Sequence, residues 1–273
     1  MSERRVRVYD DPQALTRAVA LRFIKRMTEV LEVKPEAHVV LTGGTMGEAV
    51  LSSIAGAKGR GALDWSRITF WWGDERYLPA GDPDRNETQS RRALLDALGL
   101  APERIKAFPA LGEHDSIQAA AAAYAAELAA AATDGAPYPV FDLTFLGVGP
   151  DGHIASLFPD HDAVHDRDHS VVAETASPKP PPERLTLTLP VINSSDRIWL
   201  VLAGADKAGA LGLALANANP EDVPVAGVHG RQRTVFFVDR DAAAEVPESL
   251  LTRERFWTAA HETHEGFPGR SAR

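Results

Sequence analysis

Short apolar runs recur along this chain, each closed by a turn rich in glycine or charge, with helix-forming segments between them. We expect buried strands at residues 37–41, 68–72, 141–146, 198–202 and 234–238, the last of these being the final strand. Apolar runs of this length are typical of parallel strands covered on both faces. The alternation of strands and helices predicts an α/β fold, namely a three-layer α/β/α sandwich around a mostly parallel, Rossmann-like sheet.

Helical segments are expected at residues 15–31, 88–98 and 117–132, after the turn at 42–44 through residue 54, and from residue 206 onward. Asp11 and Pro12 form a start signal for the first of them, because aspartate caps helices and proline suits the first turn. Residues 185–189 alternate leucine and threonine, which predicts a half-exposed strand. Since no internal repeat or linker interrupts the pattern, we predict one domain over residues 1–260 and a polar, flexible tail over residues 261–273.

The composition excludes several classes of function. The 273 residues include no cysteine, which rules out disulfides, thiolate nucleophiles and cysteine-ligated metals. Lysine and arginine number 29 against 38 aspartate and glutamate, and the net charge of −9 disfavours nucleic acid as a partner. The sequence shows neither an apolar leader nor an apolar stretch of membrane length, so we expect a cytoplasmic protein that does not contact membranes.

A glycine-rich turn made of Thr42, Gly43, Gly44 and Thr45 joins a predicted strand to a predicted helix. Glycines let the backbone approach an anion closely, and a helix N-terminus offers free N–H groups and partial positive charge. The two threonines can add hydroxyl donors. The pattern predicts a phosphate site, and a tight turn with a threonine N-cap explains the same residues equally well.

Two further strand ends carry cations. Asp74, Glu75 and Arg76 follow one predicted strand, and arginine can hold a phosphate through two parallel hydrogen bonds. Lys207 follows another strand at the start of a helix, where it can supply a point charge. The alternatives are a solvated charged turn and a surface lysine. Because ligands bind at the carboxyl ends of parallel strands, the location favours a binding site.

His153 lies in a glycine-rich turn after the predicted strand at residues 141–146. The unperturbed histidine pKa of about 6.5 suits a general base at neutral pH. Asp151 is close enough in sequence to orient the imidazole ring. We therefore predict His153 and Asp151 as catalytic residues, with Asp74 as a further catalytic candidate, and a structural role is the alternative for a lone histidine.

Three more histidines, His161, His165 and His169, are interleaved with aspartates downstream. A metal site is conceivable there, but no HExxH or comparable ligand spacing occurs. The preferred interpretation is a solvated polar loop. We predict neither a metal nor a cofactor.

Together these segments resemble the glucosamine-6-phosphate isomerase/6-phosphogluconolactonase family, and within it the 6-phosphogluconolactonases. The matching segments are TGGT at 42–45, WGDER at 72–76, GVGPDGHIASLFP at 147–159, RLTLT at 184–188 and GADKA at 204–208. They occur in the order expected of that family and span nearly the whole chain, and DGHIASLFP is the most specific of them.

The resemblance implies a metal-independent hydrolase of the oxidative pentose phosphate pathway that opens 6-phosphogluconolactone. It implies that His153 is the base, that the glycine loop, Arg76 and Lys207 hold the phosphate, and that Arg184 lines the site. Two segments depart from the family pattern. The glycine loop usually reads SGGSTP and here reads TGGTMG, and a usual Ser-Asn pair is here Arg85-Asn86, which leaves the role of that loop open.

Two other functions fit part of the pattern. A glucosamine-6-phosphate isomerase/deaminase needs further carboxylates, which its family supplies with an Asn-Glu pair after a DGHIAF run, whereas Ser156-Leu157-Phe158-Pro159 occupies these positions here. A sugar-phosphate sensor of a transcription regulator usually carries a helix-turn-helix segment, and we identify none in the sequence. We therefore expect hydrolysis of a small sugar-phosphate lactone, with the oligomeric state left open.

Overall fold

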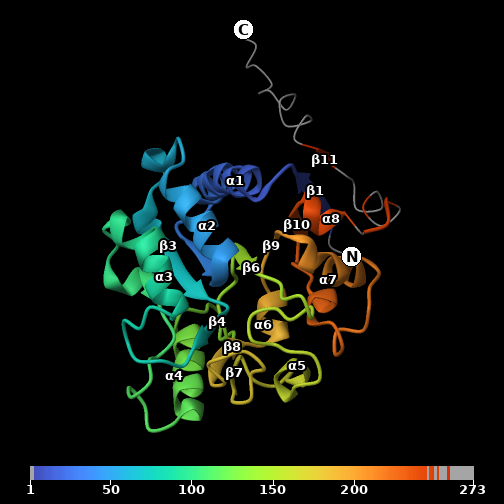
Figure 1. Ribbon diagram of the computed structural model, residues 1–273. Coiled ribbons are helices and arrows are strands. Elements are labelled where there is room, and N and C mark those ends of the chain that lie inside the picture. Colours follow the sequence, from blue (N-terminus) through green and yellow to red (C-terminus); the bar gives the residue numbers. More distant parts are fainter. Residues whose placement is uncertain (1–2, 245, 249–250, 252–256, 259–273) are drawn as a thin grey trace.

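A parallel sheet forms the centre of the protein, as shown by a computed structural model that describes residues 3–244, 246–248, 251 and 257–258 (Figure 1). All neighbouring strands of this eight-stranded sheet run parallel. In spatial order its strands are β11 (Trp257–Thr258), β1 (Glu3–Tyr9), β10 (Arg233–Asp239), β9 (Arg197–Leu202), β6 (Leu143–Leu146), β2 (Ala37–Leu41), β3 (Ile68–Trp72) and β5 (Ile105–Lys106).

Helices cover both faces of the sheet, which confirms the three-layer α/β/α architecture. The helices are α1 (Pro12–Val33), α2 (Gly44–Ala55), α3 (Asn86–Ala93), α4 (Ile117–Ala130), α5 (Asp162–His165), α6 (Leu189–Asn193), α7 (Ala208–Leu215) and α8 (Arg240–Ala243). Successive side chains of a strand point to opposite faces. In β3, Phe70 packs through Trp65 onto Phe23 of α1, whereas its neighbour Trp71 packs edge-on against Tyr124 of α4.

A smaller antiparallel sheet lies beside the main one and contains β4 (Asp74–Arg76), β8 (Arg184–Leu187) and β7 (Val171–Glu174) in that order. The expectation of a half-exposed strand at residues 185–189 is wrong, since every residue of β8 is buried and α4 packs on this sheet. Thr186 tolerates burial because its hydroxyl donates to the Leu187 carbonyl at 3.0 Å and accepts the Ser156 N–H at 3.3 Å.

The sequence located most elements within a few residues. The expected strands at 37–41 and 68–72 match β2 and β3, and Asp11 caps α1 by accepting the Ala14 N–H at 2.6 Å. The strand β1 was missed because arginines interrupt its apolar pattern, and β11 follows β10, which is therefore not the last strand. The expected helix at 88–98 ends at Ala93, and a short 3₁₀ turn follows it.

The predicted end of the domain, at residue 260, lies in a part of the chain that the structure does not describe. Residues 259–260 and the expected tail at 261–273 lie outside the described residues, so the boundary at 260 stays a prediction. Within the described residues, no helix is both long enough and apolar enough to cross a membrane.

Candidate active site

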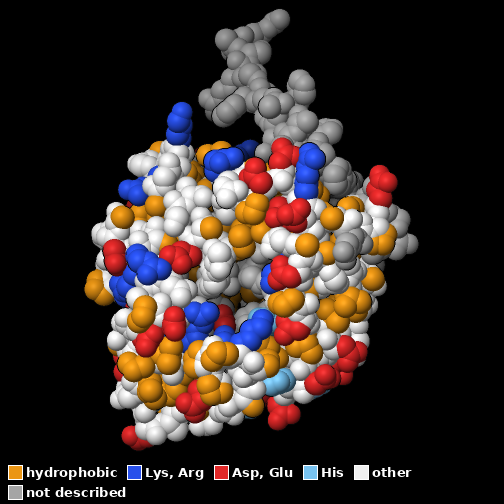
Figure 2. Space-filling view, in the orientation of Figure 1, with side chains coloured by type: hydrophobic (Ala, Val, Ile, Leu, Met, Phe, Trp, Pro, Cys, Tyr) orange, Lys and Arg blue, Asp and Glu red, His pale blue; other side chains and the backbone are white. Residues whose placement is uncertain are grey.

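A cavity of about 540 Å³ opens where β2, β6 and β9 end, at the carboxyl edge of the main sheet. In the space-filling view, lysine and arginine side chains gather around a hollow near the middle of the face shown (Figure 2). Sequence reasoning had singled out most of the functional groups that line the cavity, namely Thr42, Gly43, Gly44, Thr45, Asp74, Arg76, His153, Arg184 and Lys207. The predicted site residues are therefore brought together, although they are spread over more than half of the chain.

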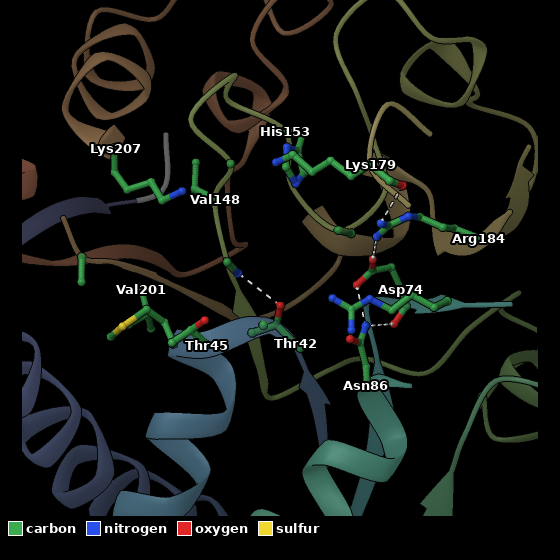
Figure 3. A pocket seen from close by; sticks show the side chains of 18 of the residues that line it. Thr42, Thr45, Asp74, Asn86, Val148, His153, Lys179, Arg184, Val201 and Lys207 are labelled. Carbon is green, nitrogen blue, oxygen red and sulfur yellow. Dashed lines mark hydrogen bonds and ion pairs between the residues drawn. The ribbon is translucent and has the colours of Figure 1, made fainter. Parts of the chain in front are cut away.

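The first turn of α2 faces this cavity. Gly43 is the N-cap residue and makes no side-chain capping bond, so no threonine caps the helix as the alternative interpretation required. Instead, Thr42 Oγ1 accepts the Gly147 N–H at 3.2 Å, which ties the turn after β2 to the turn after β6 (Figure 3). The free N–H groups and the dipole of this helix end favour an anion.

Both glycines of the turn are required by its geometry. A Cβ atom on Gly43 would lie 1.8 Å from the Oδ1 atom of Asn86. Gly44 has a φ of +77°, in the left-handed region that side chains disfavour. The backbone can therefore take this path only with glycine at these positions.

His153 and Asp151 form a hydrogen-bonded pair at the wall of the cavity. The Nδ1 atom of His153 lies 2.5 Å from Oδ1 of Asp151, and His153 itself lines the cavity. The tight turn leaves no room for a side chain at Gly149, whose Cβ would lie 2.0 Å from His153 Nδ1. The other ring nitrogen, Nε2, makes no hydrogen bond to any residue that the structure describes, so it is available to a bound molecule.

The carboxylate of Asp151 stays ionised at neutral pH. Partial burial acts to raise its pKa, but the hydrogen bond and charge of His153 and the charge of Lys179 outweigh that effect and lower the pKa to about 2. An ionised carboxylate on Nδ1 fixes the tautomer that carries its proton on that nitrogen, and Nε2 is then free to accept a proton.

Asp74 connects three parts of the site. Its Oδ2 atom accepts the Ser156 hydroxyl at 2.7 Å and lies 4.0 Å from Arg184 Nη1. Its backbone carbonyl accepts the Asn86 side-chain amide at 2.9 Å. Asp74 lines the cavity, and these contacts hold the loop that follows His153, the start of α3 and strand β8 in fixed relation.

Glu75 points away from the cavity and is completely buried. Its carboxylate accepts the backbone N–H groups of Arg76, Asn86 and Glu87 at 2.7–2.9 Å, which anchors the first turn of α3. Burial raises its pKa to about 7, against the opposing effects of Arg85 and the backbone hydrogen bonds.

The structure answers the question left by Arg85 and Asn86. Arg85 is buried and donates to the carbonyls of Phe108 at 2.7 Å and Leu78 at 3.1 Å, so it braces the loop rather than the cavity. Asn86 lines the cavity, and its buried Oδ1 atom has no hydrogen-bond partner among the residues that the structure describes. Sequence reasoning noticed this pair only as a departure from the family pattern.

Four cations line the cavity in the described part of the chain: Arg76, Lys179, Arg184 and Lys207. Arg76 donates to the Asp84 carbonyl at 2.5 Å, and the Nζ atom of Lys207 lies 2.9 Å from Oδ2 of Asp206. Arg184 donates to the carbonyls of Lys179, Pro180 and Pro181 at 3.1–3.2 Å. Lys179 was missed because its proline-rich segment was interpreted as a surface loop, yet a lysine between prolines shortly before Arg184 was a usable signal.

The downstream histidines do not converge on a common point. His161 pairs with Glu174 at 3.0 Å, and His169 pairs with Asp166 at 2.8 Å. His165 lies 3.5 Å from a third carboxylate, that of Glu221. Across the described residues, no three histidine or acidic side chains are grouped so as to hold a metal ion.

Comparison with known proteins decides the family. The family model described as glucosamine-6-phosphate isomerases/6-phosphogluconolactonase matches residues 10–237. The chain belongs to this family. It is 47% identical to a 6-phosphogluconolactonase of Streptomyces coelicolor, over 89% of this chain and 95% of that one. It is 41% identical to a 6-phosphogluconolactonase of Mycobacterium tuberculosis, over 89% of this chain and 98% of that one.

Solved structures share the fold. A 6-phosphogluconolactonase from Thermotoga maritima matches with a TM-score of 0.76 and 29% identity, over 87% of this chain and 100% of that one. A monomeric glucosamine-6-phosphate deaminase matches with a TM-score of 0.72 and 24% identity, over 88% of this chain and 99% of that one. Because both activities occur on this fold, the residues of the site must distinguish them.

Proposed function

We propose that this protein hydrolyses 6-phosphoglucono-1,5-lactone to 6-phosphogluconate, a reaction of the oxidative pentose phosphate pathway. The observation that carries the proposal is the His153–Asp151 pair, in which His153 lines a cavity together with four cations and the N-terminal turn of α2. The names of the relatives at 47% and 41% identity support it.

In the proposed mechanism, His153 is the general base. Its Nε2 atom takes a proton from a water molecule, and the resulting hydroxide attacks the lactone carbonyl carbon. The tetrahedral intermediate then collapses, the bond to the ring oxygen breaks, and protonated His153 returns the proton to that oxygen. Asp151 holds the ring in the required tautomer and stabilises the imidazolium. Asp74 keeps the loop of His153 in place through Ser156.

The phosphate group is proposed to bind at the first turn of α2, with Arg76 and Lys207 as its cations. The turn offers N–H groups from Gly44 and Thr45. The Arg184 guanidinium donates hydrogen bonds to three backbone carbonyls, so its proposed role is to hold the wall of the cavity in place. These anchors position a substrate without supplying the chemistry.

The deaminase alternative lacks its acidic groups in this structure. Leu157 and Phe158 occupy the positions where the family's deaminases carry an Asn-Glu pair, and both are buried. Both side chains are apolar, so neither position offers a carboxylate to the cavity. The geometry therefore favours ester hydrolysis over isomerisation.

The test of the function is a direct comparison of two reactions. Acid formation from freshly generated 6-phosphogluconolactone is measured beside ammonia release from glucosamine 6-phosphate, with the spontaneous hydrolysis of the lactone subtracted. We expect acid formation far above the spontaneous rate and no ammonia release. Ammonia release alone would make the protein a deaminase, and tight binding of the sugar phosphate with no turnover of either compound would make it a sensor.

The proposal also covers location and partners. A cytoplasmic location agrees with the absence of cysteine from the sequence. The partner is a small phosphorylated sugar, and the net charge of −9 argues against nucleic acid.

A further inference from the structure

Lys179 extends into the cavity from a braced segment between β7 and β8. Its carbonyl accepts the Arg184 guanidinium at 3.1 Å and the Ser177 hydroxyl at 2.8 Å, and its own N–H donates to Ser177 Oγ at 3.2 Å. The segment is closed by the Ser177 N–H, which donates to the Pro182 carbonyl at 3.0 Å. The backbone that carries Lys179 is therefore fixed before any ligand binds.

The ammonium group of Lys179 differs from the other cations of the cavity. Arg76, Arg184 and Lys207 each contact a carbonyl or a carboxylate, as described above. The Lys179 ammonium makes no hydrogen bond or ion pair with any residue that the structure describes. A cation that is partly desolvated and unpaired is unfavourable on its own and attracts an anion.

The position of this ammonium relates it to the catalytic pair. The Lys179 side chain runs from the side of Arg184 toward His153 (Figure 3), and both line the same cavity. Its charge is close enough to Asp151 to lower that carboxylate's pKa. Burial lowers the pKa of Lys179 itself, as do the charges of Lys207 and Arg184, and the carboxylates of Asp151 and Asp206 oppose this shift.

We propose that Lys179 is a catalytic residue whose ammonium stabilises the oxyanion formed on the lactone carbonyl. The inference rests on the proposed lactone hydrolysis. When water adds to the carbonyl carbon, its proton passes to His153 Nε2 and the π electrons move to the carbonyl oxygen, which faces the Lys179 ammonium. Collapse restores the carbonyl, the ring C–O bond breaks, and His153 protonates the leaving oxygen. Lys179 stays protonated throughout.

A second role for Lys179, as one more phosphate ligand, predicts different kinetics. A group that binds the phosphate contributes equally to substrate and transition state, so its loss raises KM. A group that meets charge only in the transition state lowers kcat when it is removed. An unphosphorylated lactone separates the two roles further, since it offers nothing to a phosphate ligand.

The experiment compares Lys179→Met with Lys207→Met on 6-phosphogluconolactone and on unphosphorylated 1,5-gluconolactone. For Lys179→Met we expect kcat on the phosphorylated lactone to fall about 100-fold with KM changed less than about threefold. The same relative loss in kcat/KM is expected on the unphosphorylated lactone. Lys179→Arg should recover part of the rate. Lys207→Met should instead raise KM for the phosphorylated lactone and leave the unphosphorylated one unaffected.

Two outcomes overturn the assignment. One is a Lys179→Met protein with unchanged kcat, and the other is a rise in KM confined to the phosphorylated substrate. Lys179→Gln serves as the second variant if the methionine protein does not fold, with circular dichroism as the check. Wild-type activity on the lactone separates this inference from the proposed function: an inactive wild type refutes the function, whereas an active wild type with a normal Lys179 variant refutes only the inference.

Discussion

Arg76 and Lys207 line the cavity from two different strand ends, and both are proposed to hold the phosphate. Changing either one to alanine removes a charge-assisted contact, which costs on the order of 2–4 kcal/mol. We expect a strong rise in KM and reduced discrimination against the unphosphorylated lactone. Lys58→Ala, at an exposed lysine away from the cavity, is the matched control and should behave as wild type. Unchanged discrimination in both cavity variants would remove these residues from the phosphate site.

Metal independence is a second expectation at the scale of side chains. The proposed mechanism needs only the imidazole of His153, a water molecule and fixed charges. Activity should therefore survive exhaustive EDTA treatment, measured as the initial rate of acid formation before and after dialysis. Loss of activity that zinc or another divalent ion restores would contradict this mechanism and would bring His161, His165 and His169 back as candidate ligands.

Several residues of the site were visible in the sequence because their chemistry is unusual for their location. Arg76, His153 and Lys207 follow apolar strands in glycine-rich or helix-starting segments, where no packing role explains them. Lys179 and Asn86 were harder to recognise, since their roles depend on which surfaces the fold brings together. Asn86 reaches the cavity only because Glu75 anchors the start of α3.

At the scale of elements, the junction between β2 and α2 packs so closely against Asn86 that it leaves no room for a side chain at Gly43. Gly43→Ala places a Cβ within 1.8 Å of Asn86 Oδ1, so the helix start or the asparagine must move. We expect a loss of about 1–3 kcal/mol in the free energy of unfolding and a rise in KM, because the N–H groups of α2 shift. Gly209→Ala in α7, where nothing lies within 4 Å of the added Cβ, should leave both quantities unchanged or slightly improve stability. Equal behaviour of the two variants, in denaturant unfolding and kinetics, would refute this account.

The junction between β4 and α3 should make stability depend on pH. Burial raises the folded-state pKa of Glu75 to about 7, above its ordinary value of 4.5, so the folded protein binds the proton more tightly than the unfolded chain does. This contribution to stability is present below about pH 4.5 and is lost as the pH rises through about 7. Relative to Glu75→Gln, the wild type should lose on the order of 1–3 kcal/mol between pH 5 and pH 8.

Denaturant unfolding of the two proteins at both pH values measures this difference. Glu87→Gln, on the same helix turn but partly exposed, is the control and should track the wild type more closely. A free-energy difference between wild type and Glu75→Gln that stays constant from pH 5 to pH 8 would contradict the shifted pKa.

The elements themselves were predictable to the extent that their apolar patterns are uninterrupted. Strands β2 and β3 are buried throughout or nearly so, and their limits could be predicted from the sequence. The small sheet could be predicted only in part: a strand at residues 185–189 was expected, but its burial and the strands β4 and β7 were not. Burial of the charged residues and threonines in β4 and β8 depends on partners distant in sequence. Thr186 is satisfied by Leu187 and Ser156, and Arg184 by the proline-rich segment that precedes it.

At the scale of the whole molecule, the parallel sheet explains how an acidic protein can bind an anionic substrate. Its net charge is −9, yet four cations and a helix N-terminus converge at the carboxyl edge of the sheet in the described part of the chain. The fold brings strand ends from distant parts of the sequence to one edge, and each contributes one functional segment. The fold class alone does not choose between hydrolase and deaminase, so the choice depends on the uncharged residues Leu157 and Phe158.

The most direct test of the account is the rate of the His153→Gln protein on 6-phosphogluconolactone. Glutamine keeps a polar side chain in the turn but cannot act as a base, and general base catalysis contributes about 10²–10⁴-fold. With the spontaneous rate subtracted, we predict that kcat falls by about this factor while the Kd for 6-phosphogluconate changes less than about threefold, because the phosphate anchors lie elsewhere. A folded His153→Gln protein with a kcat close to that of the wild type would contradict the central claim.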